Sequence, residues 1–259
     1  MLRGAMRPFR SLLLLLLLAI SSVARPGLAR EGDKAASPVT EANRQLVLVR
    51  SPTWWSATAV LQRYERSSSG AWAAAGASTP VNLGRGGMGW GRGLHTQLKN
   101  GPVKAEGDGR SPAGAFALSR AFGVAEQLPQ GARDFPYLHS SASTYCVEDA
   151  RSRYYNQIID ANDVRRSAWE KWSELRRADG LFDWGVIVQQ NDPEPRKGAG
   201  SCVFLHVWRG PRIPTSGCTA MPREQIEAVV RWLDPHAEPL LVQLPEPVLQ
   251  EVRESWHLP

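Results

Sequence analysis

The sequence predicts a β-rich α+β domain, and three observations favour this fold class. Short runs rich in Val, Leu, Ile and aromatic residues recur between residues 45 and 208, as is typical of strands. Clusters of Gly, Pro, Ser and Asn separate these runs and indicate turns. Only the segments 162–180 and 221–233 carry apolar residues at the three- and four-residue spacing of a helix.

The expected strands follow one another along the chain with short connections. The segments 57–64 and 70–76 are expected to form a hairpin around the turn "RSSSG". The segment 202–208, "CVFLHVW", is nearly all apolar and is therefore expected at the centre of a sheet. The other strands are expected at 45–51, 79–84, 114–123 and 184–191, and a proline-rich tail closes the chain.

Two helices complete the expected fold. Asn162 or Asp163 can cap the first, in which Trp169, Trp172 and Leu175 recur on one face up to the glycine at residue 180. We expect this face to pack into the core. The second helix is amphipathic and spans residues 221–233, with a proline near its start.

The first 29 residues have the parts of a secretory signal peptide. Arg3, Arg7 and Arg10 form a basic start, and nine apolar residues, 12–20, follow. A membrane-spanning helix takes about 20 such residues, so an uncleaved anchor is only the alternative. We therefore expect export to the periplasm or cell envelope. The expected parts of the chain are a signal peptide at 1–29, cleaved after Ala24 or Ala29, a flexible linker at 30–44 and one domain at 45–259.

Charge and glycine content exclude two classes of function. The chain has 31 basic and 25 acidic residues, but four arginines and no acids lie within residues 1–29, which leaves 27 basic against 25 acidic residues. A nearly neutral exported chain gives no support to nucleic-acid binding. The glycine-rich segment 84–93 lacks the following helix and the Gly-Lys-Ser/Thr of a phosphate-binding loop, so we expect tight turns there rather than a nucleotide site.

Three cysteines are an odd set for an oxidising compartment. At most two of Cys146, Cys202 and Cys218 can pair with each other, which leaves at least one free thiol. No pair has the close spacing of a structural zinc site. A structural zinc site is therefore not expected.

One histidine and one cysteine have the context of a nucleophile and its base. His206 lies in the predicted central strand, on the face opposite Val203, Leu205 and Val207. Cys218 lies in a turn of small residues between this strand and the second helix, where backbone N–H groups could hold an oxyanion. The helix after this turn would lower the pKa of the thiol, and an imidazole would take its proton. The alternative is a core histidine beside a disulfide cysteine.

The residues around this pair resemble the YkuD-type L,D-transpeptidase catalytic domain. His206, Thr215, Gly217 and Cys218 match the histidine, the Ser/Thr, the glycine and the cysteine of the pattern of that family. Upstream, "EGDGRSPAGAFAL" is similar to the family's "GDGRTPxGxF". The chain departs from the pattern in three ways. Ser216 stands where the family has histidine, and Ala220 stands where better-known members carry Arg or Asn. The spacer between the histidine and the Ser/Thr is also short.

The resemblance implies a β-sandwich with a few helices that acts on the peptidoglycan stem peptide as a monomer. It also implies that the reaction needs neither a metal nor an organic cofactor. Cys218 would attack the carbonyl of an L,D peptide bond to form a thioester, and His206 would be the base. Thr215, Ser216 and Gly217 would shape the oxyanion site, and a third group, such as a backbone carbonyl, would orient the histidine. Cys146 and Cys202 would form a disulfide.

Several alternatives stay open at this point. The acyl group can pass to an amine, as in a transpeptidase, or to water, as in an L,D-carboxypeptidase or amidase of the same fold. A third possibility is a non-catalytic wall-binding module. Four residues could line the cleft or belong to the scaffold: Asp149, Tyr154, Tyr155 and Asn156.

Overall fold

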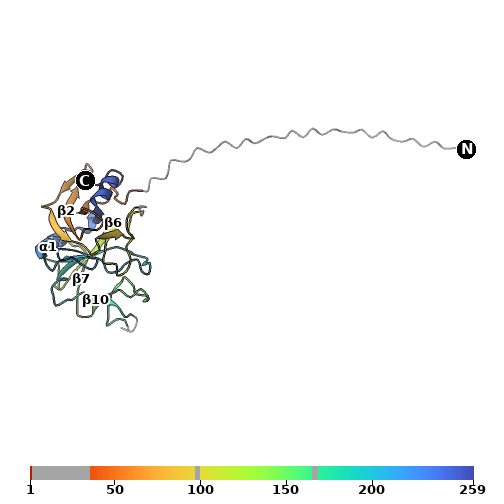
Figure 1. Ribbon diagram of the computed structural model, residues 1–259. Coiled ribbons are helices and arrows are strands. Elements are labelled where there is room, and N and C mark those ends of the chain that lie inside the picture. Colours follow the sequence, from red (N-terminus) through yellow and green to blue (C-terminus); the bar gives the residue numbers. More distant parts are fainter. Residues whose placement is uncertain (2–35, 97–99, 165–168) are drawn as a thin grey trace. The chain divides into compact units, whose positions relative to one another are not determined.

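The computed structural model describes residue 1 and residues 36–96, 100–164 and 169–259. The chain divides into Met1–Lys34 and a compact unit, Ala35–Pro259, which holds every helix and strand of the described residues (Figure 1). The predicted signal peptide and both cleavage sites lie outside the described residues. No helix among the described residues is long and apolar enough to cross a membrane.

The main sheet of the unit closes on itself within the described residues. Its strands pair in the order β1-β14-β6-β11-β12-β13-β4-β2, and β2 also pairs with β1. The eight strands are β1 (Gln45–Ser51), β2 (Thr58–Arg66), β4 (Thr79–Asn82), β6 (Ser111–Gly123), β11 (Trp184–Val188), β12 (Phe204–Val207), β13 (Thr219–Met221) and β14 (Leu240–Pro245).

Smaller elements are added to this closed sheet. Strands β3 (Trp72–Ala74), β5 (Met88–Trp90) and β7 (Tyr137–His139) pair with its strands, and β8 (Thr144–Val147), β9 (Ile158–Asp160) and β10 (Trp172–Glu174) form a separate sheet. Helix α1 (Arg223–Trp232) packs on β11 and β12, and α2 (Glu246–Val252) packs on β1 and β14. A short 3₁₀ helix spans Pro235–Ala237. These elements confirm a β-rich α+β fold.

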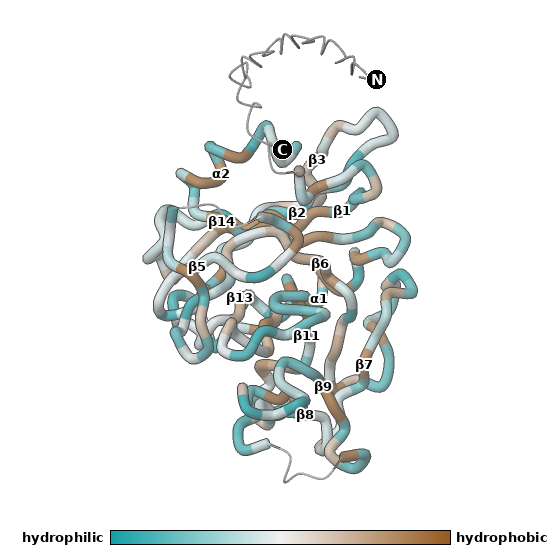
Figure 2. Tube along the Cα trace, turned by 90° about the vertical axis from the view of Figure 1, so that its right-hand side faces the viewer, coloured by the Kyte–Doolittle hydropathy of each residue, from teal (hydrophilic) through white to brown (hydrophobic). Residues whose placement is uncertain are grey.

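Apolar runs explain why the central strands form. Leu46 to Val49 of β1 and Leu240 to Val242 of β14 are at most 2% exposed, and the two strands pair in parallel. Figure 2 shows the hydrophobic colouring along both strands. Because one face of this pair meets the core and the other meets α2, neither strand shows alternation.

Most of the predicted strands are confirmed. Strand β1 has the predicted bounds, and β2 and β3 form the predicted hairpin. Strand β12 lies between β11 and β13, as expected for a central strand. Helix α1 confirms the second predicted helix.

The predicted helix at 162–180 is wrong. Trp172 begins strand β10 and pairs with Val147 of β8. Trp169 packs edge-on against Tyr154, with ring centroids 6.0 Å apart. Leu175 is buried in a different cluster, beneath β12. The helical spacing of these residues therefore reflects burial against different neighbours; residues 165–168 lie outside the described part.

Two segments expected to be irregular are packed. The predicted proline-rich tail contains β14 and α2. Within the predicted linker, Val39 is 2% exposed, and Asn43 bonds the Thr40 N–H at 2.7 Å and the Glu238 carbonyl at 2.9 Å. Residues 30–35 lie outside the described part.

Candidate active site

The segment 202–207, which ends in strand β12, presents alternate residues to two apolar clusters. Val203, Leu205 and Val207 lie in the main core, whereas Cys202 and Phe204 lie in a second cluster with Phe122, Leu175 and Phe182. The alternation predicted from the sequence is therefore confirmed. His206 belongs to the second face and lines a cavity of about 460 Å³.

A backbone carbonyl fixes the tautomer of His206. Its Nδ1 lies 2.7 Å from the Val207 carbonyl oxygen. Because a carbonyl only accepts, Nδ1 carries the proton and Nε2 keeps its lone pair. The ring also meets Phe182 edge-on, with centroids 5.0 Å apart. The carbonyl is the orienting group that the sequence could not name.

Burial makes His206 a neutral base. Desolvation lowers the pKa of its imidazole to about 4, and the charge of Arg177 acts in the same direction. The bond to Val207 opposes this shift without cancelling it. At neutral pH the unprotonated Nε2 is therefore available to accept a proton.

Thr215 holds the turn that carries Cys218. Its hydroxyl donates to the Cys218 carbonyl at 2.6 Å and accepts from the Gly217 N–H at 3.1 Å. Ser111 of β6 donates to the same carbonyl at 3.0 Å. Glycine is required at 217 because φ is 153° and a Cβ would lie 3.1 Å from the Arg110 carbonyl oxygen.

Cys218 is a free, half-buried thiol. Its Sγ accepts from the Phe204 N–H at 3.4 Å and donates to the Cys202 carbonyl at 3.6 Å. Burial raises the pKa of the Cys218 thiol to about 11. The predicted lowering by a helix terminus is wrong: β13 lies between Cys218 and α1, which begins only at Arg223.

The cavity brings the two predicted catalytic residues together. Cys218 and His206 both line it, as do Thr215, Ser216 and Gly217. Ser216 is exposed at its edge. Since the Gly217 N–H is bound by Thr215, it does not serve as an oxyanion donor. Within the described residues neither the Ser216 N–H nor the Cys218 N–H has a protein acceptor, so these two N–H groups of the turn are left free to donate.

Charged side chains of both signs surround the pair. Lys104, Glu106, Glu148, Arg177 and Arg209 all line the cavity. Burial raises the pKa of Glu148, against the effect of a hydrogen bond from Ser173. None of these five residues was identified as a site residue in the sequence, because each is far along the chain from His206 or lacks a motif of its own.

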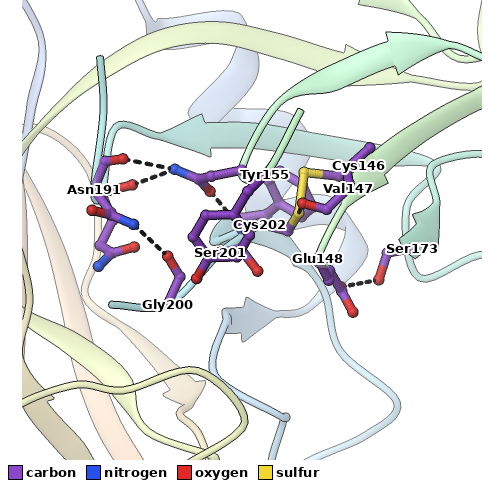
Figure 3. The surroundings of a disulfide bond; sticks show 12 residues. Cys146, Val147, Glu148, Tyr155, Ser173, Asn191, Gly200, Ser201 and Cys202 are labelled. Atoms are coloured by element: carbon purple, nitrogen blue, oxygen red, sulfur yellow. Dashed lines mark hydrogen bonds between the residues drawn. A yellow bond between two sulfur atoms is a disulfide. The ribbon is translucent and has the colours of Figure 1, made fainter. Parts of the chain in front are cut away.

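The disulfide between Cys146 and Cys202 is present. It joins β8 to the segment that enters β12, with Cα atoms 6.0 Å apart (Figure 3). Cys202 has a φ of 55°, and its N–H donates to Asn156 Oδ1 at 2.9 Å. Asn156 in turn donates to the Asn191 carbonyl at 3.0 Å. Asn156 is thus a scaffold residue that supports the disulfide.

Tyr155 contacts the edge of the cavity. Its hydroxyl donates to Glu106, which also accepts from Ser201 at 2.7 Å. Tyr155 therefore reaches the cavity through its hydrogen bond to Glu106, which lines it. Within the described residues no group of three or more His, Cys, Asp or Glu side chains is arranged to hold a metal ion.

Comparison with known proteins gives no family assignment. No family model matches the chain. No curated protein matches it either.

Proposed function

We propose that the protein is an exported cysteine acyltransferase that attacks an L,D peptide bond of the peptidoglycan stem peptide. One observation carries the proposal: the free Cys218 thiol and the basic Nε2 of His206 line the same cavity. A nucleophile beside an oriented base is the arrangement that acyl transfer requires.

The neutral pair supports a general-base mechanism. His206 Nε2 takes the Cys218 proton as Sγ attacks the carbonyl carbon, and the Cys218 N–H donates to the developing oxyanion. The C–N bond then breaks, and the imidazolium gives its proton to the departing amine of the D-residue. A thioester on Cys218 remains, and an acceptor amine or water, deprotonated by His206, releases the acyl group.

The charges of the cavity support a stem peptide as substrate. Such a peptide carries both carboxylates and an ammonium group. The cavity offers Arg177 and Arg209 to the former and Glu106 and Glu148 to the latter. Both signs of charge lie within one cavity, as a zwitterionic ligand requires.

Resemblance to the YkuD-type L,D-transpeptidases supports the same reaction. The matching histidine and cysteine lie on β12 and on the turn before β13, in a closed β-rich sheet. We propose that the fold is a variant of the sandwich of that family. Ala220 pairs with His206 across β12 and β13 and lines the cavity, so a small buried side chain lies beside the base where better-known members carry a larger one.

Muropeptides test the proposal. Wild type and Cys218→Ala are incubated with tetrapeptide muropeptides, and the products are analysed by mass. Wild type is expected to release D-Ala and to form cross-linked or exchanged products, and Cys218→Ala is expected to form neither. Release of D-Ala without any transfer product would instead favour the hydrolase of the same fold.

Thiol labelling tests the non-catalytic alternative. A wall-binding module needs no reactive thiol, whereas acyl transfer needs Cys218 to be accessible. We expect a small uncharged thiol reagent to modify Cys218 in the folded protein, since this residue lines the cavity. An unreactive Cys218 would contradict both enzyme functions.

A further inference from the structure

A buried lysine lies at the cavity beside the cysteine turn. The side chain of Lys104 is 5% exposed, yet the residue lines the cavity. The Lys104 N–H donates to the Trp90 carbonyl of β5 at 2.9 Å, which fixes the backbone at this position. Buried ammonium groups are rare because their desolvation is costly, and this one therefore needs an explanation.

The ammonium group of Lys104 is held in one place. Its Nζ donates to Asp108 Oδ1 at 2.9 Å and to the Ala105 carbonyl at 3.3 Å. Asp108 also accepts from the Ala105 N–H at 2.8 Å and from the Arg110 N–H at 2.9 Å, so the carboxylate is itself fixed. An ammonium has three N–H donors, and within the described residues the protein accepts from two.

Gly200 makes room for this side chain, and Gly217 places the cysteine turn in contact range of its ammonium group. A Cβ on Gly217 would lie 3.7 Å from Lys104 Nζ, and a Cβ on Gly200 would lie 2.9 Å from its Cε. Gly217 directly precedes Cys218. The charge is thus placed next to the backbone of the nucleophile.

Other charged groups also face Cys218. Burial is the largest influence on the pKa of the thiol; among the charges, Glu148 raises the pKa and Lys104 lowers it. The remaining titratable or charged residues around the cavity are His206, Glu106, Arg177 and Arg209. Lys104 therefore opposes both the burial and the nearby carboxylate.

We propose that Lys104 is a positioning residue whose fixed ammonium stabilises the negative charge that forms on Cys218 Sγ when its proton leaves. Asp108 holds the ammonium in place. The inference rests on the proposed function only in treating Cys218 as the nucleophile. A fixed positive charge beside the turn that carries a thiol favours its thiolate form.

The pH dependence of Cys218 alkylation tests this inference without any peptidoglycan. Iodoacetamide reacts with the thiolate, and Cys218 is the free cysteine among the three of the chain. For Lys104→Met, we expect the midpoint of the rate to rise by about one pH unit, so that the rate near neutral pH falls about 10-fold. Lys104→Arg keeps the charge and is expected to stay within about 3-fold of wild type.

Matched variants separate charge from structure. Lys197 is exposed and does not line the cavity, so Lys197→Met is expected to leave the profile unchanged. A change in access alone would slow Lys104→Arg and Lys104→Met alike, whereas a loss of charge slows only Lys104→Met. If Lys104→Met fails to fold, Lys104→Gln, which can still bond Asp108, carries the test.

An unchanged midpoint in a folded Lys104→Met or Lys104→Gln variant would overturn the inference. The result is independent of the muropeptide assay. A shifted midpoint without acyl transfer would retain the role of Lys104 and remove the proposed function. Acyl transfer with an unshifted midpoint would retain the proposed function and remove the role of Lys104.

Discussion

His206 and Cys218 form a neutral pair at rest, because burial acts on the two groups in opposite directions. It lowers the pKa of the imidazole to about 4 and raises that of the thiol to about 11. Neither group is then charged at neutral pH. The proposed reaction would thus depend on transfer of the proton from Sγ to Nε2 during attack, not on a preformed thiolate.

The acid limb of the pH–rate profile reports this base. Since the imidazole of His206 stays unprotonated down to a pH of about 4, activity on muropeptides is expected to persist well below the ordinary histidine pKa of about 6.5. The measurement is kcat/KM against pH for the wild type. An acid limb centred at the ordinary value would mean that His206 is not the base or is not buried in the working enzyme.

Thr215 is expected to matter through one hydroxyl. Thr215→Val removes the donor to the Cys218 carbonyl and the acceptor for the Gly217 N–H. Each bond contributes about 1 kcal/mol, so kcat/KM is expected to fall at least about 10-fold. Thr215→Ser keeps the hydroxyl and is the control. Equal activity of the Val and Ser variants would show that the turn holds its shape without these bonds.

At the scale of elements, the disulfide couples the small sheet to strand β12, which carries His206. Cys146 lies on β8, and Cys202 precedes β12 and offers its carbonyl to Cys218 Sγ. The two cysteines are 56 residues apart, and closing such a loop constrains the unfolded chain by about 4 kcal/mol in the entropy model.

Removal of the disulfide is expected to affect stability and activity together. The double variant Cys146→Ala/Cys202→Ala should lose about 2 to 4 kcal/mol of unfolding free energy in urea denaturation, and its muropeptide turnover should fall. Cys218→Ala, which leaves the disulfide intact, is the control for stability. Full activity in a destabilised double variant would contradict a role for the disulfide in placing Cys218.

Strands could be predicted from the sequence where one burial pattern runs through the whole segment. Strand β12 alternates between two apolar clusters, and β1 is buried on both faces, so either pattern is typical of a strand. The helix predicted around Trp172 is wrong because the helical spacing of its apolar residues arises from contacts in two different clusters. Strand β14 was missed because prolines 239 and 245 flank a short apolar run, a pattern that is also typical of an irregular tail.

For the whole molecule, two buried histidines link stability to pH. Burial lowers the pKa of His95, like that of His206, to about 4. His95 Nδ1 accepts the Ala115 N–H at 3.1 Å, and its Nε2 has no protein partner within the described residues. Unfolding exposes both rings and returns their pKa to about 6.5.

Stability should therefore fall on acidification. Between a pH of about 6.5 and about 4 the unfolded chain binds protons that the folded one does not, so unfolding free energy decreases by up to about 3 kcal/mol per histidine. His95→Asn keeps an acceptor for Ala115 and should show a smaller decrease in urea titrations across this range. A variant that loses as much as wild type would contradict the assignment of this effect to His95.

The site was predictable where a motif lies close in the sequence, and not where the fold assembles it. His206 and Cys218 are twelve residues apart, with a small-residue turn between them. Lys104 lies beside β5 and Glu148 follows β8, each more than fifty residues from His206 and from Cys218. Only the folded structure shows that they line the same cavity. The Val207 carbonyl carries no side-chain signal at all.

Mass spectrometry of the enzyme with its substrate tests the central claim most directly. Wild type, Cys218→Ser and His206→Ala are mixed with a tetrapeptide muropeptide and quenched in acid, and Cys218 is located in the digested protein. We predict that wild type gains the acyl mass of the stem peptide without its terminal D-residue, as a thioester on Cys218, and that the two variants do not. An unmodified Cys218 in wild type, under conditions in which D-Ala is released, would contradict the covalent mechanism.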